Sequence, residues 1–261
     1  MDFEKEREDI ILFTKVGTIV LSCIALLVAG LFYFPSAIVT ISQGLSDHNI
    51  PICSVHQKQK KVALTFDVSW GNENTSSLLD TLKENNVKAS FFLTGDWIDK
   101  YPEEVQAIAH AGHDLGNHSA THSQMTKLAE EQCRKEIVYP QEQVKKLTGI
   151  RMNLYRIPFN NYNESVMKEI KGCGYYPIQW SVDSLDWKDY SATDIVKHVC
   201  KNKELKNGSI ILFHNDGKYT AEALGEVITQ LKKDGYEIVP ISQLIYIQSY
   251  HVDKNGCQYE D

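Results

Sequence analysis

Short apolar runs alternate with longer segments of helical periodicity along most of the chain. The apolar runs predict buried strands at 62–66, 89–93, 113–117, 154–157, 176–182, 209–213 and 236–241. Apolar positions spaced along one helix face predict helices near 75–85, 102–111, 130–147, 164–172, 193–199 and 220–233. Alternating strands and helices are typical of parallel β/α units around an apolar sheet. The fold class expected is therefore α/β, a compact and incomplete β/α barrel of about seven parallel strands.

One longer apolar run, residues 16–34, lies near the amino end between Lys15 and Pro35. A helix of that length spans about 28 Å, close to the roughly 30 Å hydrocarbon core of a bilayer. The run is longer than the core of a typical cleaved signal peptide, so we expect one uncleaved transmembrane signal anchor. Lys5, Arg7 and Lys15 precede the run, and no Lys or Arg occurs from 35 to 57. The positive-inside rule then places the amino end in the cytoplasm and the folded domain outside the cell membrane.

These patterns divide the chain into a short cytoplasmic tail (1–15), the anchor (16–34), a polar stalk (35–60), a folded domain (61–247) and a carboxyl-terminal tail (248–261). The chain is 43% hydrophobic and 23% charged, with a net charge of −7. Because no basic face is implied, nucleic acid is not an expected partner. The six cysteines form no CxxC motif, and an external domain would permit a disulfide between Cys53 and Cys257.

Ionisable residues follow the predicted strands at the points where the strands end. They are Asp67, His118, His122, Arg156, Asp183, Asp186 and His214. Burying such groups is costly unless they are paired, so their grouping favours a site over a core. In β/α barrels the chemistry lies at the carboxyl ends of the strands. His118 and His122 stand four residues apart, and imidazole is the commonest metal ligand in proteins.

Taken together, these segments resemble the five motifs of the polysaccharide deacetylase family, the NodB homology domain of carbohydrate esterase family 4. TFDV (65–68) resembles the motif TFDD, and HSATH (118–122) resembles H(S/T)xxH. RIPFN (156–160) corresponds to RxPxG, DSLDW (183–187) to DxxDW, and LFH (212–214) to LxH. The order and spacing agree over roughly residues 61–247. The flanking residues also resemble bacterial peptidoglycan and chitin-oligomer deacetylases.

The resemblance implies a distorted (β/α) barrel that hydrolyses N-acetyl groups of amino sugars with a divalent metal, zinc or cobalt. His118 and His122 would be metal ligands, Asp67 the general base, and Arg156 its partner. His214 would be the general acid, oriented by Asp186. The resemblance also implies three residues of the substrate pocket. The backbone N–H of Phe159 would stabilise the oxyanion, and Trp187 and Leu212 would surround the acetyl methyl group. Asp183 receives no catalytic role.

Two positions depart from the family pattern. Val68 replaces the Asp that normally supplies the third metal ligand, and a valine side chain binds no metal. Glu73 or Asn72 could supply the ligand instead, Asp67 could bind metal as well as act as base, or the site could bind metal weakly with extra water. A fourth alternative is a degenerate enzyme. Asn160 replaces the motif's glycine, a milder change because Asn tolerates left-handed backbone conformations.

The function expected is removal of N-acetyl groups from a cell-wall glycan, either peptidoglycan or a chitin-like oligomer. The alternative is a surface carbohydrate-binding protein that performs no chemistry and stacks sugar rings on Trp70, Trp187 and Tyr162. A third reading is an amide hydrolase acting on a substrate other than a sugar. His113, close to the histidine pair, is expected to be structural.

Overall fold

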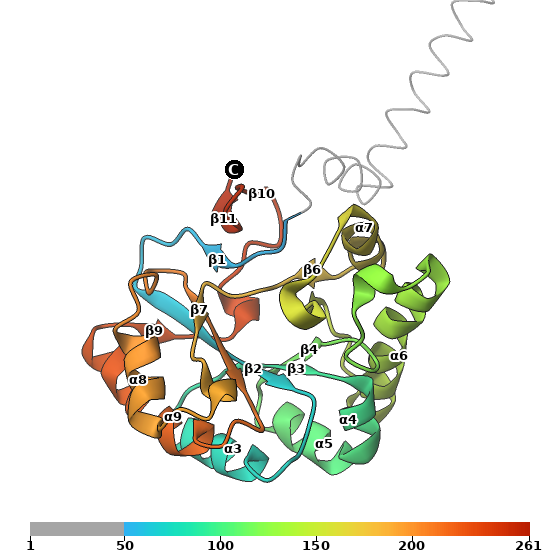
Figure 1. Ribbon diagram of the computed structural model, residues 1–261. Helices are drawn as coiled ribbons and strands as arrows, with labels where there is room; N and C mark the ends of the chain where they lie inside the picture. Colours follow the sequence, from blue (N-terminus) through green and yellow to red (C-terminus); the bar gives the residue numbers. More distant parts are fainter. Residues whose placement is uncertain (1–49) are drawn as a thin grey trace, which may run out of the picture. The chain divides into compact units, whose positions relative to one another are not determined.

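The computed structural model describes residues 50–261, and within them the chain forms an open barrel of parallel strands (Figure 1). The strands of the barrel sheet run in the order β6-β5-β4-β3-β2-β8-β7, and β9 pairs with the start of β2. Every pairing in this sheet is parallel. Its members are β2 (Lys61–Val68), β3 (Ser90–Leu93), β4 (Asp114–Asn117), β5 (Leu154–Tyr155), β6 (Tyr176–Pro177), β7 (Val182–Asp183), β8 (Ile210–His214) and β9 (Glu237–Ile238).

Helices cover the outside of this sheet (Figure 1). They are α3 (Thr75–Glu84), α4 (Gly95–Lys100), α5 (Pro102–His110), α6 (Glu130–Thr148), α7 (Glu164–Gly172), α8 (Ala192–Cys200) and α9 (Thr220–Lys233). Short 3-10 helices lie in the connections at η2 (Met125–Lys127), η3 (Pro158–Asn160), η4 (Asp186–Lys188) and η5 (Ile241–Gln243).

Alternation along β2 divides the apolar core into two clusters. Leu64 and Phe66 belong to the larger cluster, which also contains the buried faces of α3 and α9. Ala63 belongs to the smaller cluster, together with Phe92 of β3 and Ile210 of β8. Successive side chains of a strand point to opposite faces, so one strand supplies both clusters. The buried run in the sequence therefore reflects a strand covered on both sides.

The sheet does not close, because β6 and β7 are its two end strands. The segment 52–55, here called the strap, crosses this open side. Ile52 forms a parallel bridge with Ile178, just after β6, and Ser54 forms an antiparallel bridge with Ser209, just before β8. Ile52 and Val55 are buried in the smaller cluster. The strap thus fills the barrel where strand pairing is missing.

A second sheet joins the two ends of the described chain. It contains β1 (Ser54–Val55), β10 (Tyr250–Val252) and β11 (Cys257–Glu260), in the order β1-β11-β10. Residues 50–60 of the expected stalk and the expected tail (248–261) therefore belong to the folded unit. Cys257 begins β11 and Cys53 directly precedes β1, the neighbouring strand, but both cysteines are free thiols, so the permitted disulfide is not formed in this structure.

Two other expectations for the elements differ from the structure, and a third is not tested by it. The run 176–182 forms two short strands, β6 and β7, separated by residues that bond to the strap. Helix α4 was not expected, because its six residues are too few to show a helical pattern; Trp97 and Ile98 form its buried face. The expected anchor at 16–34 lies outside the described residues. Among the helices of residues 50–261, none has the length and apolarity needed to cross a bilayer.

Candidate active site

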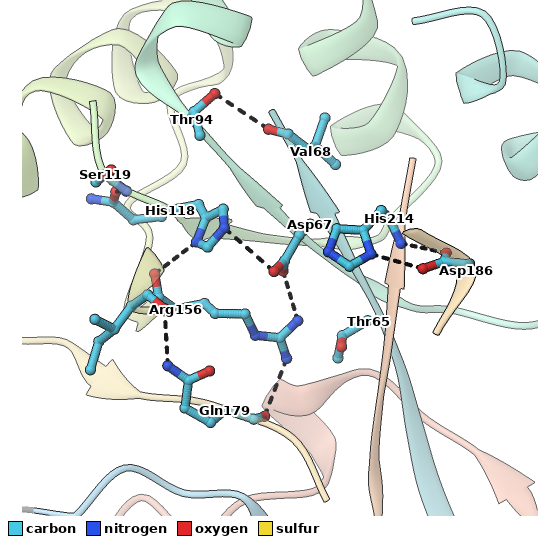
Figure 2. A network of polar contacts seen from close by, with 12 residues as sticks. Thr65, Asp67, Val68, Thr94, His118, Ser119, Arg156, Gln179, Asp186 and His214 are labelled. Carbon is cyan, nitrogen blue, oxygen red and sulfur yellow. Dashed lines mark hydrogen bonds and ion pairs between the residues drawn. The ribbon is translucent and has the colours of Figure 1, made fainter. Parts of the chain in front are cut away.

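Strand pairing brings the sequence-predicted residues to one end of the barrel. Asp67 of β2 stands in register with His214 of β8 on one side and with Phe92 of β3 on the other. His118 directly follows β4, and its backbone N–H donates to the carbonyl of Leu93 at the end of β3. Because all of these strands are parallel, their carboxyl ends meet at the same edge. Figure 2 shows the resulting polar network.

Asp67 and Arg156 form a buried ion pair. Arg156 Nη1 donates to Asp67 Oδ1 at 2.8 Å, and Arg156 Nη2 donates to the backbone oxygen of Gln179 at 3.2 Å (Figure 2). Burial alone would raise the pKa of Asp67, but the charges of Arg156 and, less strongly, of His118 and His214 lower it below its usual value. Asp67 is therefore ionised and held in one orientation.

His118 is fixed by a backbone acceptor on one ring nitrogen. Its Nδ1 lies 2.8 Å from the carbonyl oxygen of Arg156, and its Nε2 lies 3.4 Å from Asp67 Oδ2. A carbonyl can only accept, so Nδ1 carries the proton and the neutral ring leaves a lone pair on Nε2. Burial above all lowers the pKa of His118. The Nε2 lone pair thus faces a carboxylate oxygen, an arrangement that a cation between them would relieve.

His122 lies beside His118 and completes the histidine pair. The two ring centroids are 4.8 Å apart, and His122 also packs edge-on against Phe159 at 4.5 Å. Burial lowers the pKa of His122 to about 4. Both imidazoles are therefore neutral near pH 7, which is the form that binds metals.

The remaining part of a metal site is not assembled. Val68 is buried in the larger apolar cluster. Asn72 donates its amide to Glu104 at 3.1 Å, and Glu73, although exposed, is not among the residues that line the cavity. Within residues 50–261, no three His, Cys, Asp or Glu side chains are grouped so as to hold a metal. The site has two imidazoles where catalytic zinc sites usually have three protein ligands, so the residues present do not complete a metal site.

His214 is held by Asp186 from the loop after β7. His214 Nδ1 lies 2.8 Å from Asp186 Oδ1, while Asp186 Oδ2 accepts from the His214 backbone N–H and from Thr220 Oγ1 at 2.8 and 2.7 Å. Burial would lower the pKa of His214, but the hydrogen bond and the charge of Asp186 outweigh it and raise the pKa to about 9. His214 is therefore protonated at neutral pH, with Nε2 free.

A cavity of about 550 Å³ joins these groups. All three residues expected around the acetyl group, Phe159, Trp187 and Leu212, line it together with Asp67, His118, His122 and His214. Trp70, Phe159 and Trp187 are exposed at its mouth, with 56–58% of their surface accessible. Tyr162, expected to stack sugars in the binding alternative, instead packs partly buried against the larger core cluster.

Sequence reasoning missed several lining residues of this cavity, and the polar or aromatic ones among them include Trp180, Asp189 and Asp216. Each lies within three residues of a recognised motif, but no motif position marks it. Asp183 also lines the cavity, and its Oδ1 accepts from the backbone N–H of Leu185 at 2.8 Å. His113 lies away from this cavity, and its Nδ1 accepts from the backbone N–H of Ala89 at 3.2 Å.

Several site loops contain non-glycine residues in the left-handed region of φ. They are Ser119, His122, Phe159, Asn160, Leu185 and Asp189. Such conformations cost on the order of 1–3 kcal/mol each and gather at functional sites, where the surrounding structure holds them. Asn160, which replaces the motif's glycine, has φ of 51°, so this position does require the left-handed conformation. Phe159 has φ of 59°, which fixes the direction of its N–H.

Comparison with known proteins gives one family. The family model described as polysaccharide deacetylase matches residues 54–178. Peptidoglycan-N-acetylmuramic acid deacetylase PdaA of Bacillus subtilis is 36% identical over 197 residues, which is 72% of this chain and 73% of that protein. A peptidoglycan-N-acetylglucosamine deacetylase of Bacillus cereus is 36% identical over 188 residues, 70% of this chain and 68% of that protein.

Two solved structures of one pseudoenzyme are also similar to this chain. A protein of Bacillus anthracis described as a CE4 family pseudoenzyme matches with a TM-score of 0.73 and 30% identity, over 82% of this chain and 74% of that chain. A mutant of that pseudoenzyme, described as having restored enzymatic activity, matches with a TM-score of 0.72 and 32% identity, over 76% of this chain and 71% of that chain.

Proposed function

The chain belongs to the polysaccharide deacetylase family, and on that premise we propose that it hydrolyses N-acetyl groups of amino sugars in a cell-wall glycan. The proposed substrate is peptidoglycan or a chitin-like oligomer. In this proposal Asp67 is the general base and His214 the general acid.

The observation that carries the proposal is that two groups lining one cavity have pKa values shifted in opposite directions, that of Asp67 downward and that of His214 upward. The charge of Arg156 keeps the pKa of Asp67 low, whereas Asp186 raises the pKa of His214 to about 9. Both residues line the cavity, and they occupy paired positions on β2 and β8. Two titratable groups separated in this way identify acid and base roles.

The chain's own residues would divide the reaction as follows. Asp67 takes a proton from water as the oxygen attacks the acetyl carbonyl carbon. The developing oxyanion lies at the backbone N–H of Phe159, whose direction is fixed by its left-handed conformation. His214 Nε2 donates its proton to the amine nitrogen as the carbon–nitrogen bond breaks, so acetate and a free amine leave. These steps involve no metal, because two imidazoles do not complete a metal site. If zinc or cobalt takes part, His118 and His122 would be its ligands.

A second candidate is a glycan-binding protein without chemistry. The incomplete metal site and the likeness to a pseudoenzyme favour it. The exposed Trp70, Phe159 and Trp187 at the cavity mouth would then stack sugar rings.

Acetate release distinguishes the two candidates. The purified chain would be offered peptidoglycan and chitin oligomers, with and without zinc or cobalt, beside Asp67→Asn and His118→Ala variants. Release that disappears in Asp67→Asn supports the deacetylase, and its loss in His118→Ala together with a need for added metal supports the metal proposal. Saturable glycan binding by a folded protein that releases no acetate would overturn the proposal in favour of the binding candidate.

The proposed location follows from the sequence of residues 16–34, an apolar run preceded by basic residues. We propose a single-pass anchor in the cell membrane with the catalytic domain outside, where a cell-wall glycan would be met. Protease added to intact cells should digest the domain. Protection of the domain until the cells are broken would refute this placement.

A further inference from the structure

Gln179 is a buried residue outside the cavity that contacts three parts of the site's support. It is 1% exposed and lies between β6 and β7. Its backbone oxygen accepts from Arg156 Nη2 at 3.2 Å, and its side-chain Nε2 donates to the backbone oxygen of Ile157 at 3.1 Å (Figure 2). Its backbone N–H donates to the carbonyl of Ile52 in the strap at 2.7 Å.

The first two contacts connect Gln179 to Arg156, the partner of the proposed base, and to Ile157, which precedes the proposed oxyanion donor. Arg156 carries the guanidinium that orients Asp67 through a 2.8 Å hydrogen bond. Ile157 immediately precedes Pro158 and Phe159, so its carbonyl lies at the base of the loop that presents the Phe159 N–H. A single residue therefore supports the partner of the base and the loop of the proposed oxyanion donor.

The third contact, from the Gln179 N–H to the Ile52 carbonyl, attaches Gln179 to the strap across the open side of the barrel. The Ile52 N–H donates to the carbonyl of Pro177 at 2.8 Å, and the Ile52 carbonyl accepts from the Gln179 N–H. The strap is therefore paired with the segment 177–179 like an extra strand. The far end of the strap is held by the bond from the Val55 N–H to the carbonyl of Gly208 at 2.9 Å. The backbone of Gln179 is thus clamped between the strap and Arg156, although this stretch belongs to no strand of the main sheet.

We propose that Gln179 is a positioning residue, which holds Arg156 and the Phe159 loop in their working geometry and is itself held by the strap. The proposal rests on the proposed deacetylase function. Under this proposal the strap, which precedes all five motifs in the sequence, contributes to catalysis. It holds Gln179, Gln179 holds Arg156, and Arg156 orients the base Asp67.

The test replaces the side chain with one of similar size that cannot donate a hydrogen bond. Gln179→Met in the full chain removes the bond to Ile157 and also removes Gln179 Oε1, a buried acceptor without a partner among residues 50–261. Gln258→Met is the matched control. Gln258 in β11 is equally buried, its amide bonds to the backbone of Tyr246 at 2.7 and 2.9 Å, and neither residue lines the cavity.

Two readouts are expected to separate the variants. In Gln179→Met, kcat for acetate release should fall about tenfold with KM changed less than about twofold, since the Phe159 loop is loosened while the other lining residues of the cavity keep their places. Amide hydrogen exchange, followed by mass spectrometry on the peptide 156–161, should accelerate about tenfold or more. Gln258→Met should leave kcat and this exchange unchanged even if it lowers the thermal midpoint.

Unchanged exchange at 156–161 in Gln179→Met would overturn the inference, as would an equal loss of kcat in Gln258→Met. If the unsubstituted chain releases no acetate from any substrate, the proposed function fails. The exchange measurement still decides whether Gln179 holds the loop, so the two failures are distinguishable.

Discussion

The pairing of His214 with Asp186 predicts a specific dependence of stability on pH. The pKa of His214 is raised from 6.5 to about 9 by Asp186. A group whose pKa is higher in the folded state stabilises the fold below its unfolded pKa, and this stabilisation is lost as pH rises through the folded pKa. The shift corresponds to about 3 kcal/mol in full, of which roughly 2 kcal/mol should disappear between pH 7 and pH 9.

The perturbation is Asp186→Asn, and the assay is urea unfolding at pH 7, 8 and 9. The variant loses a fixed amount of stability at every pH, because three donors converge on the carboxylate and an amide offers only one oxygen. The informative quantity is the difference between its profile and that of the unsubstituted chain, which should shrink by about 2 kcal/mol from pH 7 to pH 9. His122 and His113, whose pKa values are lowered by burial to about 4, titrate below this window.

His214→Gln provides a second variant in which the titrating group itself is gone. Its profile should be flattened in the same way, because the stabilisation belongs to the protonated imidazole. The reasoning would be refuted if the unsubstituted chain and both variants lost the same stability between pH 7 and pH 9.

Four further outcomes are expected. Val68→Asp puts a carboxylate among apolar side chains, so the metal-free protein should lose several kcal/mol in urea unfolding. Zinc should bind it more tightly than the unsubstituted chain by calorimetry, and equal affinity would show that position 68 cannot reach the histidine pair. Arg156→Met leaves Asp67 buried and unpaired, which should lower the unfolding free energy by about 3–5 kcal/mol. A loss below about 1 kcal/mol would contradict the buried ion pair. Gly208→Ala should be strongly destabilising, because φ is +80° and a Cβ would lie 1.6 Å from the carbonyl oxygen of Val55. Gly172→Ala, with open space around it, is the control and should be neutral or slightly stabilising in the same assay. Trp187→Ala should change stability by about 0.5 kcal/mol or less, since the side chain is 56% exposed. It should weaken binding of chitin oligomers in calorimetry, and unchanged affinity would exclude stacking at this ring.

Most of the barrel could be predicted from the sequence because its strands are buried on both faces. A strand such as β2 is then a continuous apolar run, and the polar residue that ends it marks the site edge. The same logic located Asp67 and His214, which follow or end such runs. The pairing order of the strands was less accessible, since a strand's neighbours are fixed by packing and not by its own residues.

The parts that were missed depend on contacts between distant segments. β1, β10 and β11 are short and carry few apolar residues, so nothing in their own sequence indicates a sheet; they are stabilised by pairing with each other. The break between β6 and β7 depends on bonds from the strap to residues 177–179. Gln179 lies in an apolar run without charge or motif, and only its position against Arg156 shows what it supports.

The pairing of β1 with β11 also constrains the order of folding. Ser54, near the beginning of the described chain, stands in register with Cys257, near its end. Contacts between residues so far apart in sequence form slowly, because a long loop must close before they contribute. During synthesis, the strap cannot gain its β11 partner until nearly the whole domain has emerged from the ribosome. The parallel sheet would therefore assemble first, and sealing of the barrel beside Arg156 would be a late event in the maturation of this protein.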